Sequence, residues 1–307
     1  MAISSRFDTT RVLATVLLPT LAKGGKLQAT AVAIRTMRHL RDRYGPEPVR
    51  LRITGRSVAM LVDPTDVGRL LTQSPEPFAL VSKEKKAPLD QFQPPGKCDV
   101  DPIVRDEADL LTRHVMSTGE LTWDTFTQTW WRIVRRIVLG DRAREDTQLT
   151  GEVKTLWQNA FDAAAIVTVR ALAIGARGTH GILESARLWP TTPMILRKST
   201  IATRWHGTWL PEGTEFVVFT PFFHRDPDRL PFADRYAPEI WDQPLDPAIV
   251  PFLDEIPGRD LVLATATAML DALSEHLTFP KLAEPLPATL NHVALRMPAT
   301  PVGTRAS

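Results

Sequence analysis

The feature that most constrains the fold is a long apolar segment from about Arg259 to Leu277, which follows a Pro-Gly step at Pro257 and Gly258. Its length and composition predict a helix that is buried on most of its sides. Such a helix needs other helices to cover it. We therefore expect one core, built on this helix and on the helix that carries Glu184 and Arg187.

Other segments show either the helical period or the alternation of a strand. The further predicted helices span residues 26–44, 64–71, 105–115, 125–139, 150–174 and 181–189. Predicted strands span residues 49–53, 58–62, 194–196 and 215–219. Asp63 is expected to cap the helix that follows it. The predicted class is mainly α with a small β subdomain.

The order of these segments predicts one domain overall. Its parts are an N-terminal segment with the first helix at 1–48, a β-rich subdomain at 49–78, a helical core at 79–285 and an irregular tail at 286–307. With 43% hydrophobic residues in 307, the chain is long enough to bury a large core.

Composition excludes several classes of function. A net charge of +2, with basic residues scattered among acids, argues against nucleic-acid binding. The apolar stretch from Val12 to Leu21 is too short to span a membrane. A single cysteine, Cys98, excludes an internal disulfide, and together with dispersed histidines it predicts no metal site. These features fit the reducing cytoplasm.

One series of motifs carries more specific information. Glu184 and Arg187 lie three positions apart, so both side chains lie on one face of a helix. A block at 209–219 that ends in the predicted strand 215–219, the His224-Arg-Asp-Pro227 step and an aromatic segment at 232–241 follow in that order. A loop that begins with Phe252 and leads into the apolar helix completes the series.

In this order, the blocks resemble the cytochrome P450 superfamily, in particular a shortened member of the actinobacterial type. The resemblance implies a truncated P450-like fold. In that family a cysteine thiolate in this loop binds the haem iron. Here the loop contains Phe252, Pro257, Gly258 and Arg259 in the family's order, but Ile256 occupies the cysteine position. A hydrocarbon side chain offers no lone pair to iron.

The resemblance also implies roles for residues outside the loop. In the family, a Glu-x-x-Arg pair holds the meander that precedes the haem loop, and an arginine of that meander completes the pair. Ile240 stands at this third position, so Arg235 is expected to replace it beside Glu184 and Arg187. Arg197 matches a position that binds a haem propionate.

Asp162 lies in the segment where the family has its oxygen-activating helix, in which an acid is followed by an alcohol. Ala163 takes the place of the alcohol, so the resemblance implies loss of proton delivery. Asp162 is nevertheless the candidate catalytic residue if the chain is an enzyme.

These losses leave three hypotheses about function. The first is a haem-free accessory or scaffold protein in a natural-product pathway, since some haem-less relatives assist glycosyltransferases. The second is an enzyme that reuses the pocket for a haem-free cyclisation or rearrangement of a small apolar molecule. The third is a haem-dependent monooxygenase whose ligand loop is compensated. The first implies no cofactor and a partner such as a glycosyltransferase or another pathway enzyme.

Overall fold

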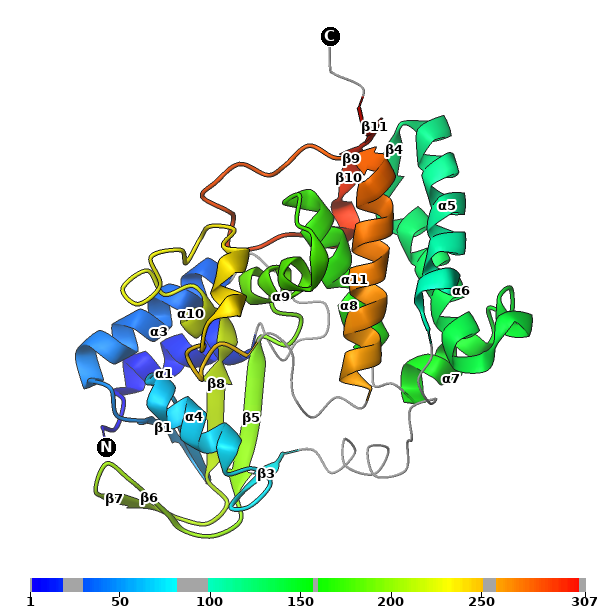
Figure 1. The fold of residues 1–307 in the computed structure, drawn as a ribbon. Helices are drawn as coiled ribbons and strands as arrows, with labels where there is room; N and C mark the ends of the chain where they lie inside the picture. The colour runs from blue at the N-terminus through cyan, green and yellow to red at the C-terminus, as the bar shows by residue number, and fades with distance from the viewer. Residues whose placement is uncertain (1, 19–29, 82–98, 157–159, 251–257, 304–307) are drawn as a thin grey trace. The chain divides into compact units, whose positions relative to one another are not determined.

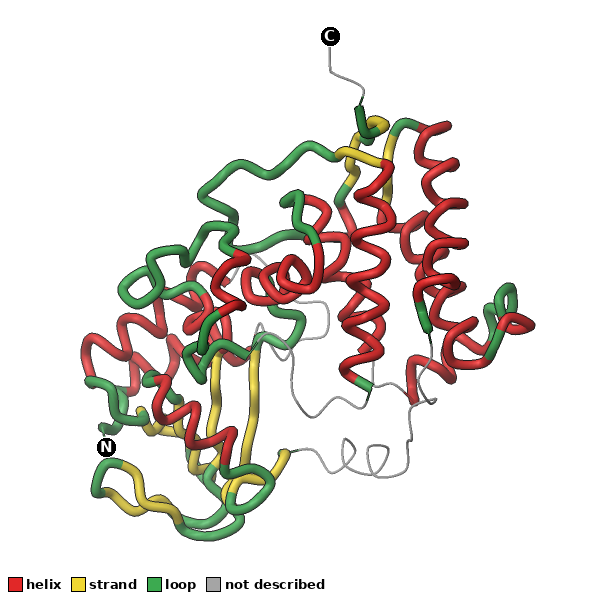
Figure 2. The backbone as a smooth tube through the Cα atoms, viewed as in Figure 1, coloured by secondary structure: helices red, strands yellow, loops and turns green. Residues whose placement is uncertain are grey.

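The computed structural model describes residues 2–18, 30–81, 99–156, 160–250 and 258–303. About 52% of the structure is helical, and a small mixed sheet accompanies the helices (Figures 1 and 2). The predicted class, mainly α with a small β part, is confirmed. No helix in the described part of the chain is both long and apolar enough to cross a membrane.

The chain forms two compact units, and each is assembled from separate segments. The sheet unit comprises residues 1–87, 192–234 and 243–250. The helical unit comprises residues 88–191, 235–242 and 251–307. The β-rich part predicted at 49–78 therefore belongs to a larger unit, because later strands complete its sheet.

The sheet unit is built around a five-stranded sheet with the order β1-β2-β8-β5-β3 (Figure 1). Its strands are β1 (Val49–Ile53), β2 (Arg56–Met60), β3 (Phe78–Leu80), β5 (Met194–Ser199) and β8 (Glu215–Phe219). The β2–β8 pair is parallel and the other pairs are antiparallel. Gly55, with φ of +73°, forms the turn between β1 and β2. This tight turn places β2 two residues earlier than predicted.

Helices pack around this sheet. They are α1 (Arg6–Val12), the π-helix η1 (Leu13–Leu17), α3 (Thr30–Tyr44), α4 (Pro64–Thr72) and α10 (Thr220–His224). The Asp63 carboxylate accepts a hydrogen bond from the Thr65 N–H, as expected of a cap at the start of α4. A hairpin of β6 (Thr203–Trp205) and β7 (Thr208–Leu210) was not predicted. Its three-residue strands are too short to show a clear alternation.

Three aromatic rings form the centre of the sheet unit. Phe78, Trp205 and Phe216 are fully buried. Their ring centroids lie 4.8–5.6 Å apart, and the pairs are tilted or edge-on. Aromatic pairs favour these arrangements over a face-to-face sandwich. The β6–β7 hairpin is therefore tied to the main sheet through Trp205.

The helical unit consists of long helices with short strands at their ends. Its helices are α5 (Asp101–Thr118), α6 (Trp123–Leu139), η4 (Asp141–Ala143), α7 (Leu149–Leu156), α8 (Ala160–Ala173), α9 (Gly178–Leu188), η5 (Pro238–Asp242), α11 (Arg259–His276) and η6 (His292–Ala294). Its strands are β4 (Glu120–Thr122), β9 (Leu277–Thr278), β10 (Arg296–Pro298) and β11 (Thr300–Pro301). The predicted apolar helix is α11, which packs against α5, α8 and α9 (Figure 1).

The helix predicted at 150–174 is matched by α7 and α8, and residues 157–159 between them lie outside the described residues. Conversely, α5 begins at Asp101, four residues before the predicted start. Pro102 lies in its first turn, where the missing N–H of proline costs no hydrogen bond. This proline is thus a helix-start signal.

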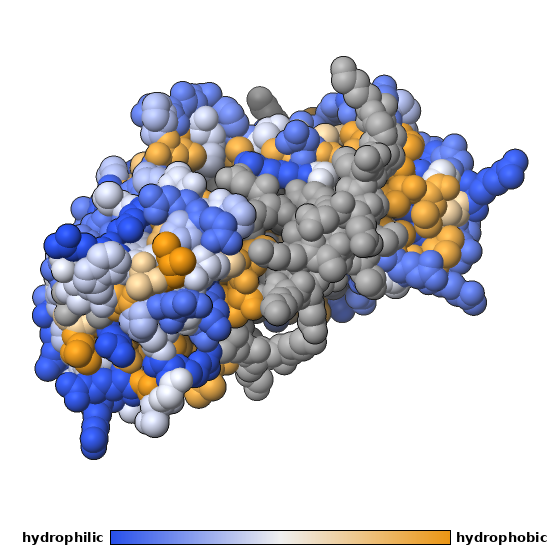
Figure 3. Space-filling view, turned by 90° about the horizontal axis from the view of Figure 1, so that it is seen from below, coloured by the Kyte–Doolittle hydropathy of each residue, from blue (hydrophilic) through white to orange (hydrophobic). Residues whose placement is uncertain are grey.

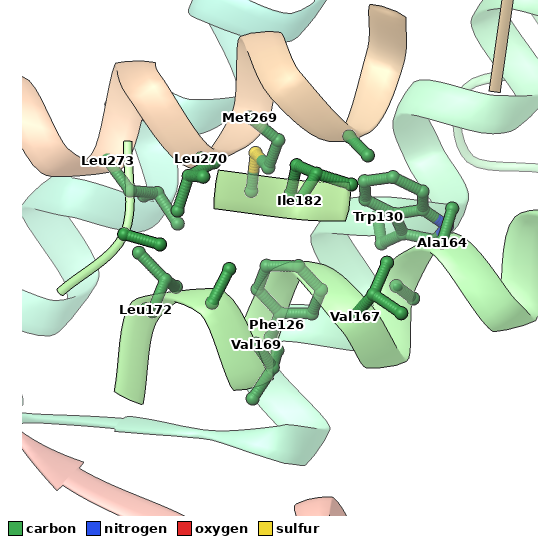
Figure 4. Packing of buried hydrophobic residues seen from close by; sticks show 14 of the residues in the cluster. Phe126, Trp130, Ala164, Val167, Val169, Leu172, Ile182, Met269, Leu270 and Leu273 are labelled. Atoms are coloured by element: carbon green, nitrogen blue, oxygen red, sulfur yellow. The ribbon is translucent and has the colours of Figure 1, made fainter. Parts of the chain in front are cut away.

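Apolar side chains from α6, α8, α9 and α11 meet in one core (Figure 4). Trp130 lies at its centre, fully buried, and its indole Nε1 donates a hydrogen bond to the carbonyl oxygen of Phe161 at 3.0 Å. This bond joins α6 to α8. On the coloured parts of the face shown in Figure 3, charged and polar residues lie among patches of apolar residues.

We expect Trp130→Phe to lower the free energy of unfolding by about 1–3 kcal/mol, because it removes a buried hydrogen bond and part of the ring. Trp209→Phe is the matched control, since Trp209 is 66% exposed on the hairpin. This control should stay within about 0.5 kcal/mol of the parent. Urea unfolding followed by circular dichroism measures both. Equal effects of the two variants would contradict the assigned core.

Candidate functional site

Glu184 and Arg187 lie side by side on α9, and both side chains are 0% exposed. Arg187 Nε donates to Glu184 Oε2 at 2.8 Å, and Arg187 Nη2 donates to Glu184 Oε1 at 2.6 Å. The pair is therefore bidentate, which is the strong geometry for arginine and carboxylate. The spacing of three residues places both groups on one helix face, as the sequence predicted.

The segment 235–241 supplies further partners of this pair. The Ala237 N–H donates to Glu184 Oε1 at 2.9 Å, and the Trp241 indole Nε1 donates to Glu184 Oε2 at 3.2 Å. Arg187 Nη2 also donates to the backbone carbonyl of Arg235 at 2.9 Å. Each carboxylate oxygen thus accepts two hydrogen bonds. We call this group of five residues the Glu184 clamp.

The clamp stabilises the structure because its hydrogen bonds offset the cost of burying two charges. An isolated buried carboxylate costs several kcal/mol, and an ion pair recovers this cost when further hydrogen bonds satisfy both groups. All four hydrogen bonds to Glu184 are charge-assisted. The clamp holds an irregular segment and the short helix η5 against α9. The polar atoms of the clamp are occupied by these structural hydrogen bonds.

The expected role of the Arg235 side chain is wrong. This side chain is 68% exposed and pairs with Glu284 at 3.4 Å, rather than with Glu184. The residue contributes its carbonyl oxygen instead. The third side chain of the clamp is Trp241, which directly follows Ile240. An indole N–H there supplies a donor without adding a charge. The sequence resemblance implied a cation as the third member, so Trp241 was not predicted.

Asp162, the candidate catalytic acid, lies in the first turn of α8 and its side chain is 34% exposed. Its Oδ1 lies 3.3 Å from the Lys154 Nζ of α7. The same ammonium lies 4.6 Å from the centroid of the Trp131 ring, in a cation–π contact. Asp162 therefore takes part in a surface ion pair that joins α7 to α8.

Arg197, the candidate propionate ligand, lies on β5 in the sheet unit and is buried. Its Nε donates to Ser74 Oγ and its Nη1 donates to the Leu196 carbonyl, both at 3.1 Å. These contacts tie β5 to the turn that follows α4. The guanidinium thus has a structural role inside its own unit.

The candidate loop is described in part. Phe252, Ile256 and Pro257 lie outside the described residues, as does Cys98. Gly258 has φ of +68°, in the left-handed region that glycine adopts without strain, and α11 begins at Arg259. The predicted entry into the apolar helix is therefore present at Gly258.

No group of three or more His, Cys, Asp or Glu side chains within the described ranges is arranged to hold a metal ion. A scan against protein-family models finds no match, and a search of curated proteins finds no significantly similar sequence.

The two assignments of the third clamp member can be separated by mutation. We expect Trp241→Phe to lower the free energy of unfolding by about 1.5–3 kcal/mol, because it removes a donor to a buried charge. Arg235→Ala keeps the backbone carbonyl and removes an exposed ion pair, so its effect should stay below about 0.5 kcal/mol. Urea unfolding measures both, and the opposite order would restore the guanidinium of Arg235 as the third member.

Proposed function

We propose that this chain is a haem-free relative of the cytochrome P450 superfamily, with a shortened fold, that acts as an accessory or scaffold protein in a natural-product pathway. Its partner in this proposal is a pathway enzyme such as a glycosyltransferase. The proposal combines the order of the sequence blocks with the use that the structure makes of their polar residues.

The Glu184 clamp is the observation that carries the proposal. In the family, the corresponding pair has a structural role, holding the meander to the helix. Here the pair is fully buried, every oxygen of Glu184 is satisfied, and a tryptophan completes it. The chain keeps a complete clamp while it lacks the iron ligand. This combination supports the inference that selection has maintained the fold rather than oxygen chemistry.

The donor groups of this chain do not fit haem. The position that corresponds to the thiolate is Ile256, whose side chain cannot coordinate a metal. Arg197, the propionate candidate, already donates to Ser74 and Leu196. Asp162 lacks the following alcohol and is paired with Lys154. No step of a monooxygenase reaction is therefore assigned to these residues.

Haem binding provides the first test. The purified full chain is mixed with haem, reduced and exposed to carbon monoxide, and its difference spectrum is recorded. We expect no Soret band of the thiolate type, because no thiolate occupies the ligand position. A protein-bound haem with such a band would contradict the proposal and favour the monooxygenase hypothesis.

A second experiment separates an accessory protein from a haem-free enzyme. A glycosyltransferase that co-purifies with the chain from the native host is assayed with and without it. We expect the chain to raise the glycosyltransferase rate, and Asp162→Ala to have the same effect as the parent, because Asp162 serves as a surface ion pair. Turnover of a small apolar substrate by the isolated chain, lost in Asp162→Ala, would favour the enzyme instead.

A further inference from the structure

A buried arginine in the helical unit lacks a carboxylate partner among the described residues. Arg170 lies on α8, a helix rich in alanine and valine, and is 4% exposed. Burial alone accounts for the lowering of its pKa to about 10, so the side chain remains charged at neutral pH. Uncompensated buried cations are costly, and buried charges in proteins are usually paired.

The hydrogen bonds of Arg170 leave one edge of its guanidinium incompletely used. Nη1 donates to the Trp189 carbonyl at 2.8 Å, and Nη2 donates to the Leu290 carbonyl at 3.0 Å. The His292 Nδ1 lies 3.5 Å from Nη2, at the outer limit for a hydrogen bond. The Nε donor is buried and has no hydrogen-bond partner in the described structure.

Arg187 shows how a carboxylate binds to this edge of a guanidinium. There, Nε and Nη2 donate to the two oxygens of Glu184. In Arg170, Nε is unused, and Nη2 both donates to the Leu290 carbonyl and has the long contact to His292. A carboxylate that takes the place of His292 could therefore pair with Nε and Nη2 of Arg170 while the carbonyl contacts of Nη1 and Nη2 remain.

Arg135 provides the contrasting case of a buried arginine whose donors are used. Its Nε donates to the carbonyls of Ala143 and Arg144, its Nη1 donates to Thr150 Oγ1, and its Nη2 donates to the Arg144 carbonyl. Each guanidinium nitrogen of Arg135 thus has a neutral acceptor although the residue is buried. The unpaired Nε of Arg170 is therefore a feature of its own site.

The segment that contacts Arg170 through His292 is short and mostly exposed. His292 belongs to η6, a three-residue 3-10 helix that has no buried residue, and Val293 beside it is 62% exposed. The His292 ring meets Trp123 edge-on, with centroids 4.6 Å apart. A ligand that displaces His292 from Nη2 would move a short surface turn and leave the core helices in place.

We propose that Arg170 anchors a binding site for a small monocarboxylate, entered from the side of His292. One guanidinium supplies a single positive charge, and its planar fork matches a carboxylate. The ring of Trp123, which contacts His292, offers an apolar surface for a small hydrocarbon body on the ligand. The inference does not depend on the relationship to cytochrome P450.

His292 provides a direct readout. Burial, followed by the charge of Arg170, lowers the pKa of His292 to about 4. The folded protein therefore keeps this imidazole neutral at pH 7, and its Nδ1 can accept from Arg170. A bound carboxylate would neutralise the guanidinium and expose the ring, and both effects raise the pKa of His292.

Benzoate is the probe for this site. The C2–H resonances of the seven histidines are followed by NMR as the pH is varied, with and without benzoate, and His292→Ala assigns the signal. We expect saturable one-to-one binding and an upward shift of the pKa of His292. Absence of saturable binding, or binding that leaves the His292 signal unchanged, would overturn the proposal.

Variants test the role of the fork. Arg170→Lys keeps the charge but loses the bidentate edge, so benzoate should bind about tenfold to a hundredfold more weakly. Arg135→Lys, at the satisfied arginine, should leave benzoate binding unchanged, and His292→Ala should retain or strengthen it. Equal binding by Arg170→Lys and the parent, or inorganic phosphate binding as tightly as benzoate, would contradict a carboxylate site. If Arg170→Lys does not fold, the His292 signal of the parent decides.

Discussion

The arrangement of the helical unit depends on the buried carboxylate of Glu184. Charged oxygen atoms inside a protein must be surrounded by donors, and this requirement selects one path for the chain around them. Arg187 comes from the same helix, but the Ala237 N–H and the Trp241 indole come from a segment about fifty positions later. The carboxylate thus decides where an otherwise irregular segment lies.

The clamp also shows which features a sequence predicts and which it does not. Asp63 as a cap and α11 as an apolar helix follow from nearby residues, since capping and helical period are local properties. The identity of the third member of the clamp depends on the tertiary structure. Either a guanidinium or an indole can donate to Glu184, and the path of the chain turns Arg235 outward and brings Trp241 inward.

Arg170 was missed for a similar reason, although the sequence contains a signal. It is the single cation within the apolar helix Ala160–Ala173, and a buried arginine is unusual in such a helix. Its role depends on its hydrogen bonds to the backbone carbonyls of Trp189 and Leu290. Backbone carbonyls have no signature in a sequence. A charge inside an apolar period therefore identifies a position to inspect, while its purpose depends on contacts that the structure supplies.

The parallel pairing of β2 with β8 has a consequence for folding of the chain during its synthesis on the ribosome. Val58 is paired with Glu215, and the residues between them include most helices of the other unit. Synthesis proceeds at about 5–20 residues per second, so β2 is made on the order of ten seconds or more before its neighbour exists. During that interval its open edge is exposed to other chains. Growth rate and chaperone supply should therefore influence the yield of folded protein more strongly than its final stability suggests.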